Sequence, residues 1–282
     1  MAAGTTQAAI EHHYDVGNDF YGLWLDRTLT YSCPLWAEGD GDDDLDLAQL
    51  RKLDYHADSL HARGKGRILD IGCGWGSKMA RLITTHGVGE VVGLTLSPAQ
   101  AAHVRALGIP RSEVQIRAWD EHVPEGLYDG IVSIEAFEHF GRLDQTREAR
   151  IAAYRDFFIY CARHLAPGGR LSLQTTAYER QERAPEFITS TIWPESELPR
   201  LTEILEASLK LFEVESIVNH RDHYARTSRL WSRRLAANAQ RATAAVGASM
   251  VENYLRYLRM TTAAFRMANY SLYRIALRRL PS

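Results

Sequence analysis

Short apolar runs alternate with segments of helical character between residues 67 and 176, and this alternation constrains the fold more than any other feature of the sequence. The runs predicted as strands are RILDIG, EVVGLTL, EVQIRAW, YDGIVSIEAF and RLSLQTT. Helices are predicted between them over 77–86, from Pro98 with Ser97 as its N-cap, and over 147–165. Such alternation is typical of a parallel sheet covered by helices on both faces, with ligands at the carboxyl ends of its strands.

The rest of the chain after this region is mainly helical. Its predicted elements are an irregular helical stretch (177–209), a late strand (FEVESIVNH, 212–220), two long helices (near 224–245 and 249–268) and a last short strand (SLYRIAL, 271–277). We therefore expect an α/β fold with a seven-stranded, mostly parallel sheet, a helical N-terminal segment and a helical lid. One domain is expected to span residues 1–282.

Charge and cysteine content limit the classes of function. Lys and Arg number 33 against 35 Asp and Glu, whereas a protein whose main partner is nucleic acid needs a strongly basic surface. The first residues, MAAGTTQAAIEHHYDVG, lack a basic region followed by an apolar run, and no stretch is apolar enough to span a bilayer. Cys33, Cys73 and Cys161 have no CxxC spacing, so we expect reduced thiols in a cytoplasmic protein.

A glycine-rich loop, Asp70-Ile-Gly-Cys-Gly-Trp-Gly76, follows the first predicted strand. Glycines at this place let the backbone approach a ligand closely. The dinucleotide fingerprint is not met, because the third glycine comes one position early and the second strand ends in Leu94-Thr95-Leu96 without an acid. Asp70 suits a ligand with an amino group, or a loop that needs a carboxylate brace. The loop therefore predicts a cofactor other than NAD.

Two patterns could suggest a metal. The run GDGDDDLD (39–46) lacks the glycine that a calcium loop requires and has Arg51 where that loop needs a glutamate. We interpret it as a solvated loop whose aspartates favour the start of a helix near Leu47. Glu11, His12 and His13 have no spaced partner that would complete a metal site. No metal is predicted.

Seven segments of the chain resemble the cyclopropane-fatty-acid synthase and mycolic-acid cyclopropane synthase family of S-adenosylmethionine-dependent methyltransferases. They are HYDVGNDFYGLWLD (13–26), YSCPLW (31–36), ILDIGCGWG (68–76), VVGLTLSPAQ (91–100), IVSIEAFEHFG (131–141), LAPGGRLSLQTT (165–176) and HYARTSRLW (223–231). They occur in the family's order. The resemblance implies a class I (Rossmann-like) methyltransferase fold, and we expect it to comprise an N-terminal helical cover (1–60), a cofactor-binding core (61–176), a lid insertion (177–210) and C-terminal helices with the last strands (211–282).

The resemblance also implies contacts with S-adenosylmethionine along the predicted carboxyl edge. The residues are Asp70 beside the loop, Tyr31 and Ser32 at the methionine part, Gly72 and Gly74 across the loop, Thr95, Leu96 and Gln100 near the ribose, Trp119 and Asp120 at the adenine, and Ile134 at the methyl-donor end. The amide of Gln100 would replace the missing acid, because it can bond ribose hydroxyls.

The catalytic group that the resemblance implies includes a bound bicarbonate. The matching residues are Cys33, largely through its backbone, with Glu138 and Tyr224. When an alkene takes up a methyl group it becomes a carbocation, and a base must remove a proton before a ring can close. An exchangeable anion serves this purpose without the risk that a side-chain carboxylate attacks the cation. Glu138 would hold the hydroxyl of bicarbonate and Tyr224 would donate to one of its oxygens.

Two segments depart from the family pattern. Gln174 stands where many members have a histidine that contacts the anion, and glutamine donates a hydrogen bond without carrying charge. This change puts cyclopropane formation in doubt and favours simple methylation. Trp193-Pro194-Glu195-Ser196 replaces an aromatic-Pro-Gly-Gly turn and indicates a different acceptor.

Other residues near the expected site have two interpretations. His139 is either a general base of an N- or O-methyltransferase or a structural neighbour. Aromatic rings such as Phe137, Tyr14 and Trp24 could stabilise cationic charge. The tyrosines and Phe265 near the C-terminus, interleaved with arginines, either pack a helical lid or meet anionic phospholipid or an acyl carrier protein: Tyr254, Tyr257, Tyr270, Tyr273, Arg256, Arg259, Arg266 and Arg274.

We therefore expect methyl transfer from S-adenosylmethionine to a carbon nucleophile, most simply the cis alkene of an acyl chain. The first alternative is a small-molecule C- or N-methyltransferase of specialised metabolism, because the scaffold does not determine the acceptor. The second is a cofactor-binding protein without catalysis, against which Glu138 and Tyr224 argue. No oligomeric state is predicted.

Overall fold

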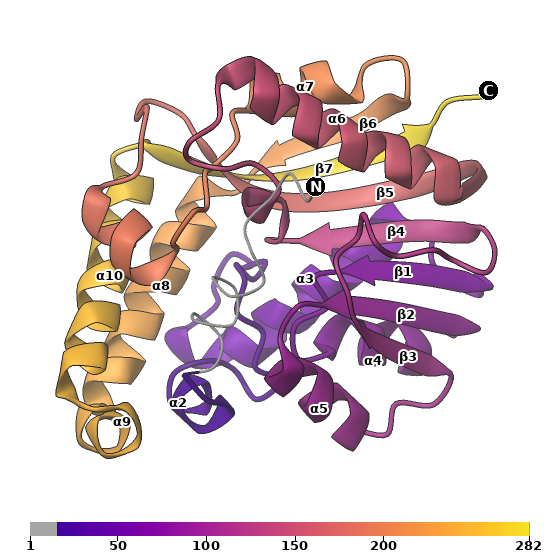
Figure 1. The fold of residues 1–282 in the computed structure, drawn as a ribbon. Coiled ribbons are helices and arrows are strands. Elements are labelled where there is room, and N and C mark those ends of the chain that lie inside the picture. The colour runs from indigo at the N-terminus through magenta and orange to yellow at the C-terminus, as the bar shows by residue number, and fades with distance from the viewer. Residues whose placement is uncertain (1–15, 282) are drawn as a thin grey trace.

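A single seven-stranded sheet, in the order β3-β2-β1-β4-β5-β7-β6, forms the centre of the computed structural model, which describes residues 16–281 (Figure 1). The strands are β1 (Arg67–Ile71), β2 (Glu90–Thr95), β3 (Ser112–Ile116), β4 (Tyr128–Ile134), β5 (Leu165–Tyr178), β6 (Phe212–Asn219) and β7 (Tyr270–Arg279). The pairs from β3 to β5 are parallel, and only β7 runs against its neighbours. The predicted α/β fold with a mostly parallel sheet is confirmed.

Each face of the sheet has its own hydrophobic core, because neighbouring residues of a strand point to opposite faces. Ile68 packs with the helices α3 (Leu45–Ser59), α4 (Ser77–Thr84) and α5 (Pro98–Ala106). Leu69 faces the core that contains residues of α6 (Arg147–His164) and α7 (Leu201–Ser208). The predicted start of α5 is confirmed, since the Ser97 hydroxyl accepts from the backbone N–H of Gln100 at 3.2 Å and Pro98 is the first helical residue.

A third core joins segments from the N-terminal part of the chain (20–48) to segments from its C-terminal part (188–272), beyond the carboxyl ends of the parallel strands (Figure 1). It is formed by residues of α2 (Asn18–Gly22), the short helix η3 (Ile188–Ile192), α8 (Arg221–Ala237), α9 (Ala239–Val246) and α10 (Ala248–Arg266). Its centre is aromatic, with Trp24 and Trp231 at a ring-centroid distance of 5.6 Å. This helical layer therefore faces the edge of the sheet at which a ligand is expected.

The structure differs from the predicted elements at several boundaries. The segment 224–245 is two helices, divided at Asn238. β5 begins at Leu165, where a helix was expected to end. The described residues contain no helix that is long and apolar enough to cross a membrane.

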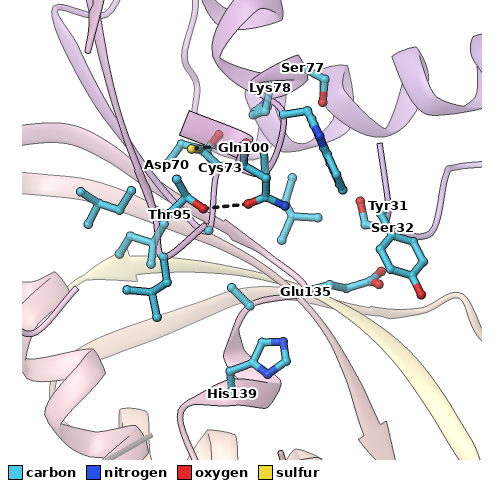
Figure 2. A pocket seen from close by; sticks show the side chains of 18 of the residues that line it. Tyr31, Ser32, Asp70, Cys73, Ser77, Lys78, Thr95, Gln100, Glu135 and His139 are labelled. Atoms are coloured by element: carbon cyan, nitrogen blue, oxygen red, sulfur yellow. Dashed lines mark hydrogen bonds between the residues drawn. The ribbon is translucent and has the colours of Figure 1, made fainter. Parts of the chain in front are cut away.

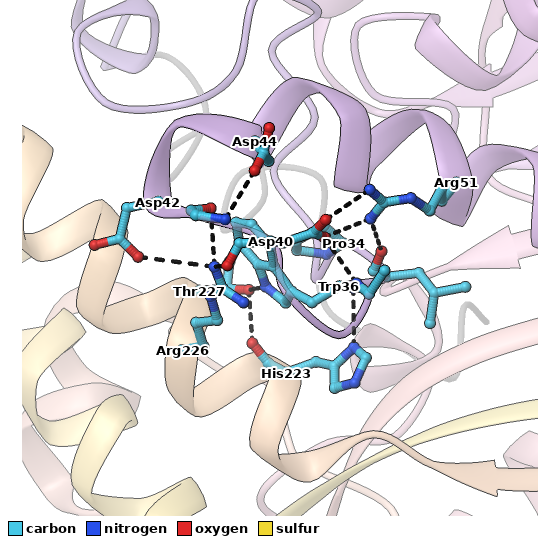
Figure 3. A network of polar contacts seen from close by, with 12 residues as sticks. Pro34, Trp36, Asp40, Asp42, Asp44, Arg51, His223, Arg226 and Thr227 are labelled. Carbon is cyan, nitrogen blue, oxygen red and sulfur yellow. Dashed lines mark hydrogen bonds and ion pairs between the residues drawn. The ribbon is translucent and has the colours of Figure 1, made fainter.

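The aspartate-rich loop leads into helix α3 through the one-turn helix η1 (Asp42–Asp44), as predicted (Figure 3). Asp40 is paired with Arg51 at 2.5 Å, and Asp42 is paired with Arg233 of α8. Within residues 16–281, no cluster of three or more His, Cys, Asp or Glu side chains could hold a metal ion. Glu11, His12 and His13 lie outside the described residues.

Candidate active site

A cavity of about 170 Å³ lies at the carboxyl ends of β1, β2 and β4 (Figure 2). Its wall includes each of the eleven residues predicted to contact the cofactor: Tyr31, Ser32, Asp70, Gly72, Gly74, Thr95, Leu96, Gln100, Trp119, Asp120 and Ile134. The loop after β1 requires its glycines, because Gly72 has φ +79° and a Cβ there would lie 2.5 Å from the Cβ of Ala136. The structure thus brings the predicted cofactor residues together.

Three buried charged side chains line this cavity and fit a ligand that carries both an amino group and a carboxylate. Asp70 is buried, its Oδ2 has no hydrogen-bond partner among the described residues, and burial raises its pKa to about 7. Lys52 donates to the Ser32 hydroxyl at 2.8 Å, and Lys78 donates to the carbonyl of Leu53 at 2.6 Å. Burial lowers the pKa of Lys52 to about 8 and that of Lys78 to about 7.

The other end of the cavity combines one oriented amide with an aromatic wall. The hydroxyl of Thr95 donates to Oε1 of Gln100 at 2.7 Å, which leaves the amide N–H groups on the opposite side of this side chain (Figure 2). Trp119 is held edge-on against Phe157 at a centroid distance of 5.5 Å. This arrangement can accept a sugar edge and a flat ring side by side.

A second cavity of about 100 Å³ lies between the carboxyl edge of the sheet and the helices η3, α8 and α10. Its lining is largely aromatic, with Tyr31, Tyr178, Trp193, Tyr224, Tyr257, Phe265 and Tyr270. Tyr31, Glu135 and His139 line both cavities. A group bound in the first cavity can therefore meet a group bound in the second at these three side chains.

The carboxylate of Glu135 is the centre of the polar network between the two cavities. Its Oε1 accepts from the backbone N–H of Cys33 at 2.9 Å and from Nε2 of Gln174 at 2.7 Å. Its Oε2 accepts from the hydroxyl of Tyr224 at 2.7 Å. Three residues predicted for the catalytic group, Cys33, Gln174 and Tyr224, are thus assembled, but around Glu135 and not around Glu138.

Glu135 follows the last residue of β4, and its backbone has φ +52°, a conformation that few side-chain-bearing residues adopt. The signal for this residue was present in the sequence, since IVSIEAFEHFG holds two glutamates at the end of a predicted strand. The family resemblance points to the second of these glutamates, Glu138. In the structure it is the first, Glu135, that accepts hydrogen bonds from Cys33, Gln174 and Tyr224.

Gln174 is fully buried, and both ends of its amide are bonded. Its Oε1 accepts from Nε of Arg274 at 2.7 Å and from His56 at 3.0 Å, while Nε2 also donates to the carbonyl of Cys33 at 3.1 Å. Burial lowers the pKa of His56 well below its usual range, so this ring is neutral. The glutamine is therefore oriented as a donor toward Glu135.

Glu138 lies in the wall of the second cavity but makes a different contact from the one predicted. Its Oε1 accepts from the backbone N–H of Thr176 at 2.5 Å, and its Oε2 has no hydrogen-bond partner among the described residues. Burial, followed by the nearby charge of Glu135, raises the pKa of Glu138 well above its usual range. Glu138 thus retains a proton where an unperturbed glutamate would have lost it.

His139 contacts the lid segment in which the sequence departs from the family. Its Nδ1 lies 2.8 Å from the hydroxyl of Ser196, and its ring lies 5.3 Å from that of Trp193. Burial lowers the pKa of His139 to about 4, so the ring is neutral at physiological pH. Glu195 has φ +66°, so a left-handed turn persists here without glycine. The Trp193–Ser196 segment therefore forms part of the second cavity's wall.

The thiol of Cys33 and two predicted aromatic rings lie outside both cavities. Burial raises the pKa of Cys33 to about 12, so this residue contributes its backbone rather than a thiolate. Phe137 and Trp24 are fully buried and line neither cavity, so their predicted role beside a cation is wrong for this geometry. Tyr14 lies outside the described residues.

Comparisons with known proteins agree with this geometry. The family model of mycolic acid cyclopropane synthetase matches residues 2–275. Cyclopropane mycolic acid synthase 3 of Mycobacterium tuberculosis is 35% identical over 277 residues, which cover 91% of this chain and 92% of that protein. Among solved structures, the cyclopropane synthase MmaA2 from Mycobacterium tuberculosis has a TM-score of 0.88 at 32% identity, covering 98% of this chain and 99% of that one.

The mycolic acid cyclopropane synthase CmaA1, complexed with SAH and CTAB, has a TM-score of 0.86 at 32% identity and likewise covers 98% of this chain and 99% of its own. The similarity thus extends over both cavities and over the helices that enclose them. The chain therefore belongs to the mycolic acid cyclopropane synthetase family and is an S-adenosylmethionine-dependent methyltransferase.

Proposed function

We propose that the protein transfers the methyl group of S-adenosylmethionine to a carbon of a cis alkene in an acyl chain, with a cyclopropane or a C-methylated chain as product. The observation that carries this proposal is the meeting of two cavities at Tyr31, Glu135 and His139. A methyl donor in the first cavity and an alkene in the second would have their reacting ends at this junction.

The residues of the first cavity fit S-adenosylmethionine, which supplies an electrophilic methyl group when bound. The unpartnered Oδ2 of Asp70 suits its amino group, while Lys52 and Lys78 suit its carboxylate. The amide of Gln100 would bond the ribose, and Trp119 would border the adenine. Ile134 would lie nearest the methyl-donor end of the cofactor, and Gly72 and Gly74 would face the cofactor across the loop.

The chain's own residues would orient the alkene and protect the cation that it becomes. The aromatic lining of the second cavity would disfavour water, which would otherwise add to the cation. The negative faces of rings such as Tyr224 and Phe265 also stabilise positive charge. A base must then take a proton. In the predicted scheme this base is bicarbonate, but the donors that would hold it, the Cys33 N–H and the Tyr224 hydroxyl, are bonded to Glu135.

A small-molecule acceptor is the second candidate function. Hydroxyl groups of Ser196, Tyr257 and Thr261 belong to residues of the second cavity's lining, beside its aromatic rings. A compact acceptor with polar groups would satisfy such a wall better than a long alkyl chain does. C- or N-methylation of such a molecule would use the same junction.

Fatty-acid analysis separates the two candidates. The protein is expressed in a bacterial host that lacks its own cyclopropane synthase, and the membrane lipids are analysed by mass spectrometry. Loss of monounsaturated chains with a matching gain of cyclopropane or methyl-branched chains would establish a lipid enzyme. Unchanged lipids, from folded protein that binds S-adenosylhomocysteine, would contradict the acyl-chain proposal and favour a small or carrier-bound acceptor.

The expected location of the protein is the cytoplasm.

A further inference from the structure

We propose that the carboxylate of Glu135 is the catalytic base of this methyltransferase and takes the place of an exchangeable anion. This inference rests on the proposed function for the identity of the acceptor. The position of the Glu135 carboxylate is a feature of the protein itself and does not depend on the acceptor. Glu135 lines both cavities, so its carboxylate lies beside the place where the methyl group would be transferred from the cofactor to the acceptor.

The hydrogen-bond donors around Glu135 are arranged so that they could bind a small anion. They come from three distant parts of the chain, the Cys33 backbone, the Gln174 amide and the Tyr224 hydroxyl, at 2.7–2.9 Å from the carboxylate oxygens. Oε1 accepts two of these bonds and Oε2 accepts one. One lone pair of Oε2 therefore remains for a proton, while the three bonds hold the carboxylate in place.

The backbone at Glu135 indicates that this placement is specific. A glutamate with φ +52° occupies a conformation that glycine would adopt without strain. A glycine at this position would leave the three donors facing an open space of the size of a carboxylate. The strained residue is therefore the one that fills the anion site.

The charges around Glu135 and Glu138 differ in sign. The positive side chains of Lys52 and Arg274 interact with the charge of Glu135, and Arg274 is fully buried behind Gln174. Glu138, three residues further along the chain, has its ionisation opposed by burial and by the charge of Glu135. His139 is neutral and Tyr224 keeps its proton, because burial lowers the pKa of the first and raises that of the second. Glu135 is thus the carboxylate of this group that the positive side chains of Lys52 and Arg274 face.

The reaction balances with this base and needs no further reactant. The π electrons of the alkene form the bond to the methyl carbon, and the electrons of the broken carbon–sulfur bond remain on sulfur as S-adenosylhomocysteine forms. The positive charge moves to the other alkene carbon. Oε2 of Glu135 then takes a proton from the new methyl group, and the released C–H electrons close the three-membered ring. Glu135 ends as the neutral acid and loses its proton to water once the product has left.

The three hydrogen bonds also explain how a side-chain carboxylate could avoid esterification by the cation. Each bond withdraws electron density from the oxygens and opposes the shift that a covalent C–O bond requires. A proton is transferred over a heavy-atom distance of about 3 Å, which a fixed carboxylate can satisfy.

The test replaces the base and then supplies an external one. Methyl transfer by the wild type is expected to be equal in buffer freed of carbonate and in buffer with added bicarbonate. Glu135→Gly is expected to be slower by at least about 100-fold without carbonate, and to recover in a saturable manner when bicarbonate is added. Glu135→Gln keeps the shape without the charge and is expected to be slow in both buffers. Lys210→Gly is the matched control, because Lys210 also has a left-handed backbone, with φ +64°, and is exposed far from both cavities.

A binding measurement makes the inference independent of the acceptor. The ¹³C resonance of labelled bicarbonate is followed on titration with each protein loaded with S-adenosylhomocysteine. We expect the Glu135→Gly variant to bind bicarbonate and the wild type not to bind it. Bicarbonate binding by the wild type, or a wild-type rate that depends on bicarbonate, would overturn the inference. Absence of product from every alkene, together with the expected binding pattern, would instead contradict only the proposed acceptor.

Discussion

Gln174 shows how a buried amide can organise charges of both signs. It faces the guanidinium of Arg274 with its oxygen and the carboxylate of Glu135 with its nitrogen. The ring of His56 completes the arrangement, since its other nitrogen lies 2.8 Å from the hydroxyl of Ser172. From the sequence, glutamine at this position is a hydrogen-bond donor without charge that puts cyclopropane formation in doubt. In the structure this neutral amide donates to the carboxylate of Glu135.

Truncation of this amide should destabilise the protein strongly. Gln174→Ala would leave Nε of Arg274 and the ring N–H of His56 without their acceptor in a fully buried site. We expect the free energy of unfolding to fall by about 3 kcal/mol, measured by denaturant titration. Gln115→Ala, at a partly exposed glutamine, should cost less than about 1 kcal/mol. A similar small loss for both variants would contradict the role assigned to Gln174.

Asp70 should make cofactor binding depend on pH. Its carboxyl group has a pKa of about 7 because it is buried, and only its charged form attracts the amino group of the ligand. As the pH falls below about 7, Asp70 gains a proton and Lys78 becomes positively charged. The protonated Asp70 no longer attracts the positive amino group, while Lys52, with a pKa of about 8, already supplies positive charge for the ligand's carboxylate, so the affinity for S-adenosylhomocysteine should fall.

Isothermal titration calorimetry between pH 6 and pH 8 measures this effect. The wild type should bind about 10-fold more tightly at the upper end of the range, whereas Asp70→Asn should bind weakly throughout. An equal pH dependence in the Asn variant would assign the effect to the ligand or to another group instead of Asp70.

At the scale of elements, the sequence predicted the order of strands and helices because their signals are local. β1 and β2 are buried apolar runs, and α5 starts at a serine cap followed by proline. The break between α8 and α9 at Asn238 was missed, since no glycine or proline marks it. The choice between Glu135 and Glu138 was also beyond local signals, because it depends on the backbone angle of one residue after β4 and on donors from distant segments.

One contact network between elements holds two of these donors in register. The segment that follows Cys33 is fastened to α8 through Arg226, whose guanidinium lies 3.9 Å from the ring centroid of Trp36 and donates to the carbonyls of Asp40 and Gly41 (Figure 3). The backbone N–H of Trp36 donates to His223 at 3.1 Å, next to Tyr224 in the first turn of α8. Arg226 is thus a positioning residue.

Arg226→Ala should slow methyl transfer more than it weakens cofactor binding. Loosening this contact would separate the Cys33 N–H from the Tyr224 hydroxyl, which lie on different elements, while the loop after β1 is not in this network. We expect kcat to fall by about 10-fold, as is usual when a reacting group is misplaced, with the Kd for S-adenosylhomocysteine unchanged. Arg229→Ala is the control, because Arg229 is exposed on the same helix and its one ion pair within residues 16–281 is with Asp42, at 3.9 Å. Equal kinetic effects of the two variants would argue against the positioning role.

For the whole molecule, positive charge is concentrated in the helical layer. Residues 221–266 contain nine arginines against one aspartate and one glutamate, whereas the chain as a whole has a net charge of -2. The predicted packing role of the C-terminal tyrosines is confirmed, since Tyr254, Tyr257 and Tyr270 are buried. Arg274 is buried as well, while Arg256, Arg259 and Arg266 are exposed.

One of the exposed arginines of α10 lies beside a segment that lines the second cavity. Their spacing of three and seven residues places them on one side of the helix. Arg256 lies 4.1 Å from the ring centroid of Phe187, and the next residue, Ile188, lines the second cavity. A lipid with an anionic head group would therefore meet positive charge beside the cavity that we assign to its acyl chain.

This asymmetry predicts reversible binding to an anionic lipid surface. The protein should sediment with phosphatidylglycerol vesicles at low salt, remain in solution with phosphatidylcholine vesicles, and be released as salt screens the charges. Arg259→Gln with Arg266→Gln should weaken the partition about 30-fold, because each arginine near such a surface contributes about 1 kcal/mol. Arg63→Gln with Arg163→Gln is the matched control, since both residues are exposed near the amino ends of β1 and β5, at the opposite edge of the sheet. Equal vesicle binding by the two double variants would mean that the helical layer does not make the lipid contact. If the protein instead binds an acidic acyl carrier protein, and only the α10 double variant loses that binding, the carrier and not the membrane is the source of the acceptor.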